Sequence, residues 1–341
     1  MKRIASFLFA LALAFSLAAC TVPVEKANDG KIQIVATLFP YYDFARAIAG
    51  DRADVTLLLS PGREAHSFEP TPLDAVTISE SDVFLYNGGE GEYWVDSMLG
   101  AAGENIAVIA RMMDYVDALD EEYVEGMQGA DGHDHDHEHG SHDDHDDHDD
   151  HDHDHEEDEH DSDEVEYDEH IWTSPKNAVV LCRAVCDAIC RADAENAEFY
   201  RANCEDYCAQ LEYLDARFSA LCESAPRKLL IFADRFPMLY FCREFGLDYR
   251  AAFHGCSGDT EPSLATIKYL IDKVEDEDIP VVYTIDFGTK KVAAVVSECT
   301  GAAVDTLYSM QTVSRADFDA GETYLTLMER NYEALRKGLN E

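Results

Sequence analysis

The sequence predicts an α/β protein of two similar lobes, each built from a mainly parallel sheet flanked by helices, joined by one long rigid α-helix. In both halves of the chain, short apolar runs of strand length alternate with helical periodicity, which indicates parallel strands with right-handed crossovers. A helical stretch of nearly 30 residues separates the halves and is long for a globular helix. Ligands of such open sheets bind beyond the carboxyl ends of the strands, so we expect the site in the cleft between the lobes.

The N-terminal lobe is expected to begin with an apolar strand, followed by a helix that ends at Gly50. Further apolar runs of strand length follow along the same lobe. The expected strands are Ile32–Thr37, Val55–Leu59, Val83–Tyr86 and Ile106–Ile109. The expected helices are Tyr41–Ala49 and Leu73–Ser79, and the loop Ser60–Pro72 precedes the second of them.

Two helices are expected in the middle of the chain. The first begins near Pro175, a residue that suits the first turn of a helix, and Ser174 is placed to cap it. Helical periodicity covers Lys176–Arg191 and resumes over Ala194–Cys222. The second helix would brace the two lobes and limit their relative motion.

The C-terminal lobe repeats the alternation of the first. Its expected strands are Leu229–Ala233, Asp248–Phe253, Val281–Ile285 and Val304–Leu307. Its expected helices are Pro237–Phe245, Ser263–Val274, Lys290–Thr300 and Gly321–Lys337. The chain is therefore divided into a lipoprotein signal peptide at 1–20, a tether at 21–30, the N-terminal lobe at 31–175, a helical segment with the linking helix at 176–226, and the C-terminal lobe at 227–341.

The first 20 residues indicate where the protein is placed. Lys2 and Arg3 precede the apolar run Ile4–Ala19, which is too short to span a bilayer comfortably and is typical of a secretion signal. The run closes as Leu17-Ala18-Ala19-Cys20, which resembles the lipobox of bacterial lipoproteins, in which the cysteine is lipidated after cleavage. No later stretch reaches the ~20 apolar residues of a membrane helix. We expect a protein anchored to the outer face of a membrane through Cys20.

The charge is strongly acidic and unevenly distributed. The net charge of -44 excludes nucleic acid and anionic membrane surfaces as partners on electrostatic grounds. Half of the excess lies between Asp131 and Glu169, a stretch with 22 Asp or Glu and no Lys or Arg. Such a segment cannot form a core, so 131–168 is expected to be a disordered acidic loop when it carries no metal.

Nine cysteines remain besides Cys20, and an odd number does not suggest a closed set of disulfides. Five of them recur at intervals of four along the two expected middle helices: Cys182, Cys186, Cys190, Cys204 and Cys208. We interpret this stripe as small apolar core residues rather than a thiolate metal site, because an oxidising compartment would threaten exposed thiols. Cys242 and Cys256 either pair with each other or stay reduced.

The 14 histidines fall into two groups. Eleven lie between His133 and His160, interleaved with aspartate. The other three, His66, His170 and His254, lie in expected loops or strand ends on the cleft side. Neutral imidazole and carboxylate suit borderline cations, zinc above all, in sites of three or four N/O ligands. Taken singly, each histidine is more often a hydrogen-bonded or surface residue than a ligand, so the surrounding sequence decides.

That surrounding sequence resembles a known family. His66 lies in Pro61-Gly62-Arg63-Glu64-Ala65-His66-Ser67-Phe68-Glu69-Pro70-Thr71-Pro72, and His170 lies in Asp168-Glu169-His170-Ile171-Trp172-Thr173-Ser174-Pro175. Both segments resemble signatures of the zinc/manganese solute-binding proteins of ABC transporters, the cluster A-I family. The resemblance covers nearly the whole mature chain, including the lipobox, the His-rich loop and the linking helix. It implies that the metal lies in the inter-lobe cleft and that His66 and His170 bind it from the first lobe.

The resemblance implies two further ligands from the second lobe. The family places its third ligand, His or Glu, at the end of that lobe's first strand, where this chain has neither. Asp234 is the nearest group able to coordinate and is assigned the third position, with a salt bridge to Arg235 or a helix cap as the alternative. The fourth ligand, an acid at the end of a later strand, maps to Asp286. His254 stays open as an alternative ligand or a residue at the cleft rim.

The His-rich loop is expected to be accessory to the cleft. Flexible chelating groups bind several ions weakly, because ordering the chain offsets much of the coordination energy. The loop gathers zinc, senses zinc abundance or is simply solvated, and these alternatives stay open. The histidines assigned to an accessory zinc-gathering role are His133, His135, His137, His139, His151, His153 and His155.

The resemblance implies a monomeric, extracytoplasmic, lipid-anchored receptor that binds Zn²⁺ with high affinity and delivers it to an ABC transporter permease. A set of two histidines and two carboxylates favours Mn²⁺ or iron more than a set of three histidines does, whereas the His-rich loop favours zinc. A metal-dependent surface adhesin is the other alternative. We do not expect an enzyme, because no general base or nucleophile motif accompanies the candidate ligands.

Overall fold

The computed structural model describes residues 30–65, 67–128, 166–257 and 261–340. Cys20, His66 and the histidines of 133–160 lie outside the described residues, so their assigned roles remain predictions. Ile32–Glu341 form one compact unit. Within the described ranges, we find no helix that combines the length and the apolar character needed to cross a bilayer.

The N-terminal sheet is parallel, with the strand order β2-β1-β3-β4. Ile34 of β1 points into a core shared with α2 and α5, whereas Val35 points to the opposite face, which is covered by α3 and α4. The strands are β1 (Ile32–Ala36), β2 (Ala53–Leu57), β3 (Val83–Tyr86) and β4 (Val108–Arg111). The helices are α2 (Phe39–Ala49), α3 (Pro72–Ser79), α4 (Trp94–Ala102) and α5 (Pro175–Ala192).

The C-terminal sheet has the same topology, with the parallel order β6-β5-β7-β8. Ile231 and Val282 pack under α8 and α9, and Phe232 and Tyr283 face the core that α7 and α11 share. The strands are β5 (Leu229–Phe236), β6 (Asp248–His254), β7 (Val281–Ile285) and β8 (Ala303–Leu307). The helices are α7 (Leu239–Phe245), α8 (Leu264–Asp276), α9 (Lys291–Thr300), α10 (Arg315–Asp319) and α11 (Tyr324–Asn340). The prediction of two similar parallel α/β lobes is confirmed.

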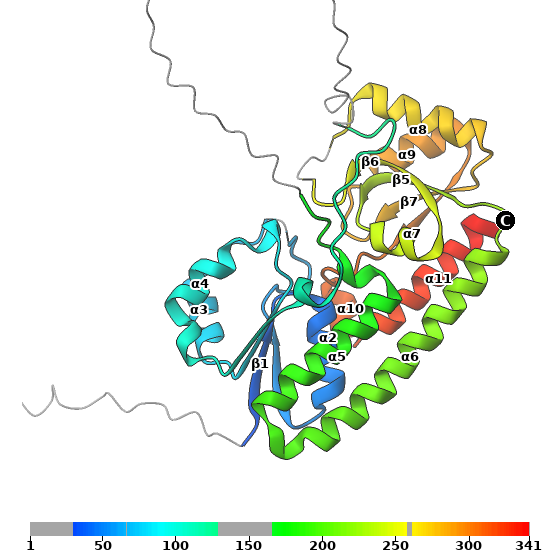
Figure 1. The fold of residues 1–341 in the computed structure, drawn as a ribbon. Helices are drawn as coiled ribbons and strands as arrows, with labels where there is room; N and C mark the ends of the chain where they lie inside the picture. The colour runs from blue at the N-terminus through cyan, green and yellow to red at the C-terminus, as the bar shows by residue number, and fades with distance from the viewer. Residues whose placement is uncertain (1–29, 66, 129–165, 258–260, 341) are drawn as a thin grey trace, which may run out of the picture. The chain divides into compact units, whose positions relative to one another are not determined.

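Helix α6 (Ala197–Ser224) is 28 residues long and packs against elements of both lobes (Figure 1). It lies against α2 and α5 on the N-terminal side and against α7 and α11 on the C-terminal side. The buried residues along it belong to one continuous core that reaches both sheets. Because one stiff element carries contacts from both lobes, we expect it to oppose large movements between them. The predicted long linking helix is confirmed.

The structure departs from the expected elements in several places: α10 was not predicted, β2 and β4 are each displaced by two residues from their predicted bounds, and α4 and β5 differ as follows. Helix α4 was not predicted, because Gly100 within it and Gly103 after it weaken the helical pattern. Strand β5 runs three residues beyond the predicted end at Ala233. It continues through a register shift between Phe232 and Arg235, which is a β-bulge against β6. Asp234 therefore lies inside the irregular part of the strand rather than after it.

Candidate metal site

His170 is held in a fixed orientation directly before α5. Its side chain is buried, and its Nδ1 lies 3.2 Å from Oδ1 of Asp168. The same carboxylate oxygen accepts the backbone N–H of His170 at 2.8 Å. Trp172 packs edge-on against the imidazole, with the ring centroids 5.6 Å apart. An imidazole held at Nδ1 by a carboxylate coordinates metals through Nε2, so Asp168 acts as an orienting partner for this candidate ligand.

A small pocket brings His170 together with residues of the C-terminal lobe. Its volume is about 10 Å³, which is the room that one water molecule or a single ion needs. Its walls come from both lobes and include Glu64, His170, Arg235, Gly255, Ile285 and Ser309. Arg235 and Ile285 belong to the carboxyl-terminal ends of β5 and β7, the sheet edge where ligands of parallel α/β folds bind.

Asp234 and Asp286 lie beside this pocket, next to its wall residues Arg235 and Ile285. Oδ1 of Asp234 accepts the backbone N–H of Arg235 at 2.9 Å, and its Oδ2 is 3.4 Å from the backbone nitrogen of Ile285. Oδ1 of Asp286 accepts the backbone N–H of Ser309 at 3.1 Å. Asp286 also lines a neighbouring pocket of about 140 Å³. Both carboxylates are therefore positioned by main-chain donors at the same end of the sheet.

The electrostatics of these carboxylates favour a bound cation. Burial raises the pKa of Asp234, and it raises the pKa of Asp286 to about 6. The negative charge of Glu64 adds to the rise at both residues. A raised carboxyl pKa means that the charged form is short of solvation or positive charge in the metal-free protein. Imidazole and carboxylate are the ligand types of zinc and manganese sites, but within the described residues the ligand atoms of His170, Asp234 and Asp286 do not all lie within 4.8 Å of one another.

Arg235 is the charged group in the pocket that the sequence analysis did not place there. Its guanidinium reaches Glu64 of the other lobe in a bidentate pair, with both N–O distances 3.2 Å. The alternative considered for Asp234, a salt bridge with the Arg235 side chain, is not what the structure shows, because that side chain turns to Glu64. The guanidinium thus supplies positive charge to the cleft of the metal-free protein.

His254 ends β6 and lies against the loop before the His-rich segment. Its Nδ1 is 3.3 Å from Oε1 of Glu121, and its ring centroid is 5.0 Å from that of Tyr123. The same oxygen of Glu121 accepts the backbone N–H of Gly255 at 2.7 Å. His254 is not among the pocket's wall residues, although Gly255 is. This placement leaves both of its predicted roles open, as ligand or rim residue.

Two acids around His170 were missed as site residues, and they change its titration. Burial alone would lower the pKa of His170, but the charge and hydrogen bond of Asp168, with a further contribution from Glu121, raise it overall. Asp168 had a sequence signal, since it stands two residues before His170. Glu121 had none, because only the fold brings it to this place.

Cys256 follows the pocket residue Gly255 and has a free thiol, as Cys242 does. Burial raises the pKa of Cys256, and the nearby charges of Glu121 and Asp168 raise it further. The two cysteines left open by the sequence are therefore both reduced in the structure. The thiol of Cys256, which is half-buried and follows a wall residue of the pocket, is a second group whose place near the cleft was not predicted.

Comparison with known proteins gives matches along nearly the full chain. It is 30% identical to the high-affinity zinc uptake system protein ZnuA of Bacillus subtilis (strain 168), over 98% of this chain and 97% of that one. It is 29% identical to the zinc-binding lipoprotein AdcA of Streptococcus pneumoniae, over 99% of this chain but only 61% of AdcA. The crystal structure of the Zn(II)-bound ZnuA-like domain of Streptococcus pneumoniae AdcA superposes with a TM-score of 0.70 at 25% identity, covering 92% of this chain and 100% of that domain.

The family model agrees with these relatives. Residues 34–338 match the model described as zinc-uptake complex component A, periplasmic, so the match includes both sheets and the linking helices. The chain therefore belongs to the periplasmic zinc-uptake component A family of solute-binding proteins.

Proposed function

We propose that this protein captures Zn²⁺ outside the cytoplasm with high affinity and delivers it to the permease of an ABC importer. The observation that carries the proposal is the ion-sized pocket lined by the buried imidazole of His170, beside which Asp234 and Asp286, two carboxylates with raised pKa values, follow or precede wall residues at the carboxyl ends of β5 and β7. Membership of a zinc-uptake family and the zinc-binding relatives support Zn²⁺ as the cargo. A receptor role, rather than catalysis, follows from the same family.

The proposed ligands are His66, His170, Asp234 and Asp286. The wall residue Glu64 stands two positions before His66 in the loop after β2, which supports a ligand role for that loop. Asp234 and Asp286 offer oxygen from the second lobe, so the proposed set contains ligands from both sides of the cleft. His254 is the alternative fourth or third ligand, and reaching the metal would require it to leave Glu121.

Binding of Zn²⁺ would replace the positive charge of Arg235 and of bound protons in the cleft. In the structure the guanidinium of Arg235 balances Glu64, the negative charge of Asp168 and Glu121 favours a proton on His170, and burial favours a proton on Asp286. Zn²⁺ would take over this balance, release the protons to solvent and move the guanidinium away from the ion. Because α6 ties both lobes into one core, we expect local rearrangement of the cleft rather than a wide hinge motion.

Manganese or iron is the second candidate cargo, because the proposed set has two imidazoles and two carboxylates. Carboxylate oxygen suits Mn²⁺ better than it suits zinc, whereas imidazole suits zinc. Competition between Zn²⁺ and Mn²⁺ for the same protein decides between them. A protein that retains Mn²⁺ in the presence of equimolar Zn²⁺ would contradict the proposed cargo.

The test is calorimetric zinc titration of the mature protein with residues 133–160 deleted, so that the loop does not contribute heat. We expect one tight site that is lost in His170→Ala and in His66→Ala. Asp305→Asn serves as a control, because Asp305 is a carboxylate on β8 that pairs with Lys337. Normal binding in both histidine variants would show that the cleft is not the receptor site. Uptake of radioactive zinc by cells that carry these variants tests delivery separately from binding.

A further inference from the structure

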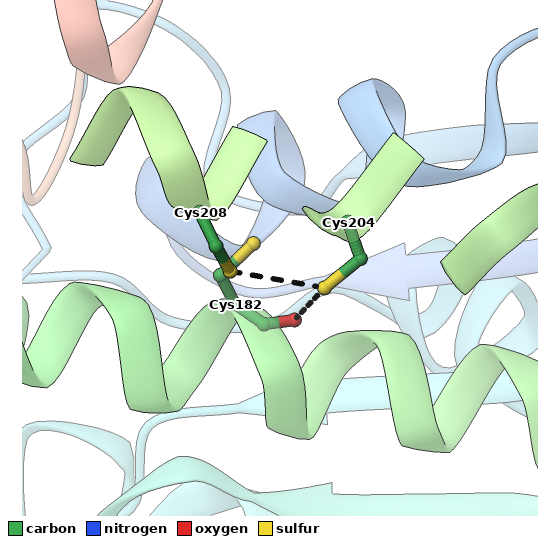
Figure 2. Close-up of side chains that lie close together, drawn as sticks. All are labelled: Cys182, Cys204 and Cys208. Carbon is green, nitrogen blue, oxygen red and sulfur yellow. Dashed lines mark hydrogen bonds between the residues drawn. The ribbon is translucent and has the colours of Figure 1, made fainter. Parts of the chain in front are cut away.

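Helices α5 and α6 hold a cluster of cysteines that the zinc receptor site does not use. The two helices are consecutive and pack against each other along their lengths. Cys182 on α5 faces Cys204 and Cys208, which are one turn apart on α6 (Figure 2). The three sulfur atoms all lie within 4.8 Å of one another, and all three residues are buried.

The spacing of the sulfur atoms suits a shared metal ion. Tetrahedral thiolate ligands at a metal–sulfur distance of about 2.3 Å place their sulfur atoms about 3.8 Å apart. The sulfur atoms of Cys204 and Cys208 are 3.9 Å apart. Cys186 lies one turn along α5 from Cys182 and lines the same surface pocket as Cys204 and Cys208, which makes it the candidate for a fourth position. Small side-chain rotations would therefore complete the coordination geometry.

Packing alone does not account for this arrangement. Helix α5 uses Ala178, Ala184 and Ala188 where it needs small buried side chains, so small volume does not require cysteine. A purely apolar role also gives no reason for the sulfur atoms of two helices to converge. The sequence analysis was right that these cysteines are buried core residues. It did not consider that burial and metal ligation are compatible when the thiolates share a cation.

The cluster is reachable from solvent. A surface pocket of about 310 Å³ has Cys186, Cys204 and Cys208 in its wall. The same wall contains three acidic residues and two arginines: Asp187, Glu205, Glu212, Arg183 and Arg201. The acidic residues outnumber the arginines by one, so the charge of the wall does not repel a cation. The ion pair of Arg183 with Glu212, at 2.9 Å, joins the two helices beside this opening. A metal ion therefore has a route to the sulfur atoms that does not pass through the cleft between the lobes.

We propose that Cys182, Cys204 and Cys208 form a second metal site, for a thiophilic d¹⁰ cation, with the thiol of Cys186 able to take the fourth position. Binding replaces the three thiol protons, which pass to solvent, by three metal–sulfur bonds. Soft thiolate ligands favour Zn²⁺ or Cu⁺ over the harder Mn²⁺ and Mg²⁺. The bound ion would join α5 to α6 and keep the thiols from oxidation. This site does not depend on the proposed delivery of zinc.

The test uses Cd²⁺ as the probe, added to the full-length protein reduced under nitrogen. Thiolate sulfur bound to Cd²⁺ gives an ultraviolet charge-transfer band that imidazole and carboxylate ligands do not give, so the His-rich loop does not interfere. We expect a band that saturates at one equivalent of sulfur-bound Cd²⁺ and is lost in Cys182→Ala and Cys208→Ala. The band should persist in Cys222→Ala, a matched control, because Cys222 is buried on the same helix outside the cluster.

A second control separates this cluster from the cleft, where Cys256 also offers a thiol. If the band is lost in Cys256→Ala and kept in the two cluster variants, the sulfur ligand lies in the cleft and the proposal is wrong. Absence of any band in the reduced wild-type protein, or its loss in Cys222→Ala, also overturns the proposal. X-ray absorption of the Cd²⁺-loaded wild-type protein gives an answer even if the variants fail to fold. Three or more sulfur neighbours support the site, and a shell of nitrogen and oxygen refutes it.

Discussion

Replacing Asp286 by asparagine should stabilise the metal-free protein while weakening its binding of zinc. The carboxylate of Asp286 is buried at the end of β7, and burial raises its pKa from the ordinary value of 3.8 to about 6. The ionised side chain is therefore poorly solvated in the folded, metal-free protein at neutral pH. Asparagine keeps an oxygen that can accept the backbone N–H of Ser309, and it removes the charge.

The size and sign of the stability effect follow from the pKa shift. Each pKa unit corresponds to about 1.4 kcal/mol, so the ionised carboxylate costs the folded state at most ~3 kcal/mol at pH 7. Between pH 4 and 6 the folded protein binds more protons at this carboxyl group than the unfolded chain does. The contribution of Asp286 to stability therefore falls as pH rises through this range. The advantage of Asp286→Asn should be largest above pH 6 and should vanish near pH 4.

Urea unfolding of chelator-treated protein, followed at several pH values from 4.5 to 7.5, measures this difference. Asp305→Asn is the control, since Asp305 is a carboxylate of β8 that forms a partly exposed ion pair with Lys337 of α11. In zinc titrations, Asp286→Asn should bind more than about 10-fold more weakly than the wild type, because it loses a charged ligand. Equal stability of the two proteins at pH 7 would refute the claim of a desolvated carboxylate. Unchanged zinc affinity would refute its role as a ligand.

Three further changes test the cleft. Zinc affinity should fall as pH drops toward 6, because protons compete with the metal at His170, whose pKa is raised. In Asp168→Asn this fall should shift to lower pH, and the affinity should be reduced by about 10- to 100-fold. An affinity that does not change from pH 5 to 8 would contradict histidine ligation. Arg235→Gln should raise zinc affinity about 10-fold by removing a competing cation, as calorimetry would show, and a weaker site would mean that Arg235 supports the ligands. Gly288→Ala should weaken zinc binding because its Cβ would lie 1.7 Å from Oδ2 of Asp234, whereas Gly100→Ala, with open space around it, should not.

The fold could be predicted because its strands are apolar and its helices are periodic. Strand β7 is buried along its whole length, and buried parallel strands appear in the sequence as unbroken apolar runs. The cap of α5 was also local, since Ser174 accepts the backbone N–H of Asn177 three residues later. Features that depend on a few neighbouring residues could thus be predicted from the sequence. The bulge in β5 was not, because an Asp-Arg pair after an apolar run indicates the end of a strand as readily as its continuation.

The parts of the candidate site that were missed are contacts between distant segments. Glu64 and Arg235 are 171 positions apart and meet only in the folded protein. Glu121 and His254 likewise come from different lobes. Neither pair has a spacing or motif that reveals it, because a salt bridge places no constraint on the residues between its partners. The sequence could therefore name candidate ligands, but it could not show which charges already occupy the cleft of the metal-free protein.

The guanidinium of Arg235 in the pocket changes how the presence of Asp234 instead of a histidine at the end of β5 should be understood. Asp234 stands near the position where the family has His or Glu, and the neighbouring Arg235 extends into the pocket instead. The guanidinium forms a balanced pair with Glu64 rather than with Asp234, whereas an imidazole in place of Asp234 would bring no negative charge into the cleft. With the proposed ligand set, binding of Zn²⁺ would displace Arg235 from Glu64 and protons from His170, so this exchange would offset part of the coordination energy. The same exchange would discriminate against weakly coordinated ions, since a cation that gains little from imidazole and carboxylate would not replace a bidentate salt bridge. We therefore expect Arg235 to set a threshold for binding, and its removal to relax selectivity as well as raise affinity.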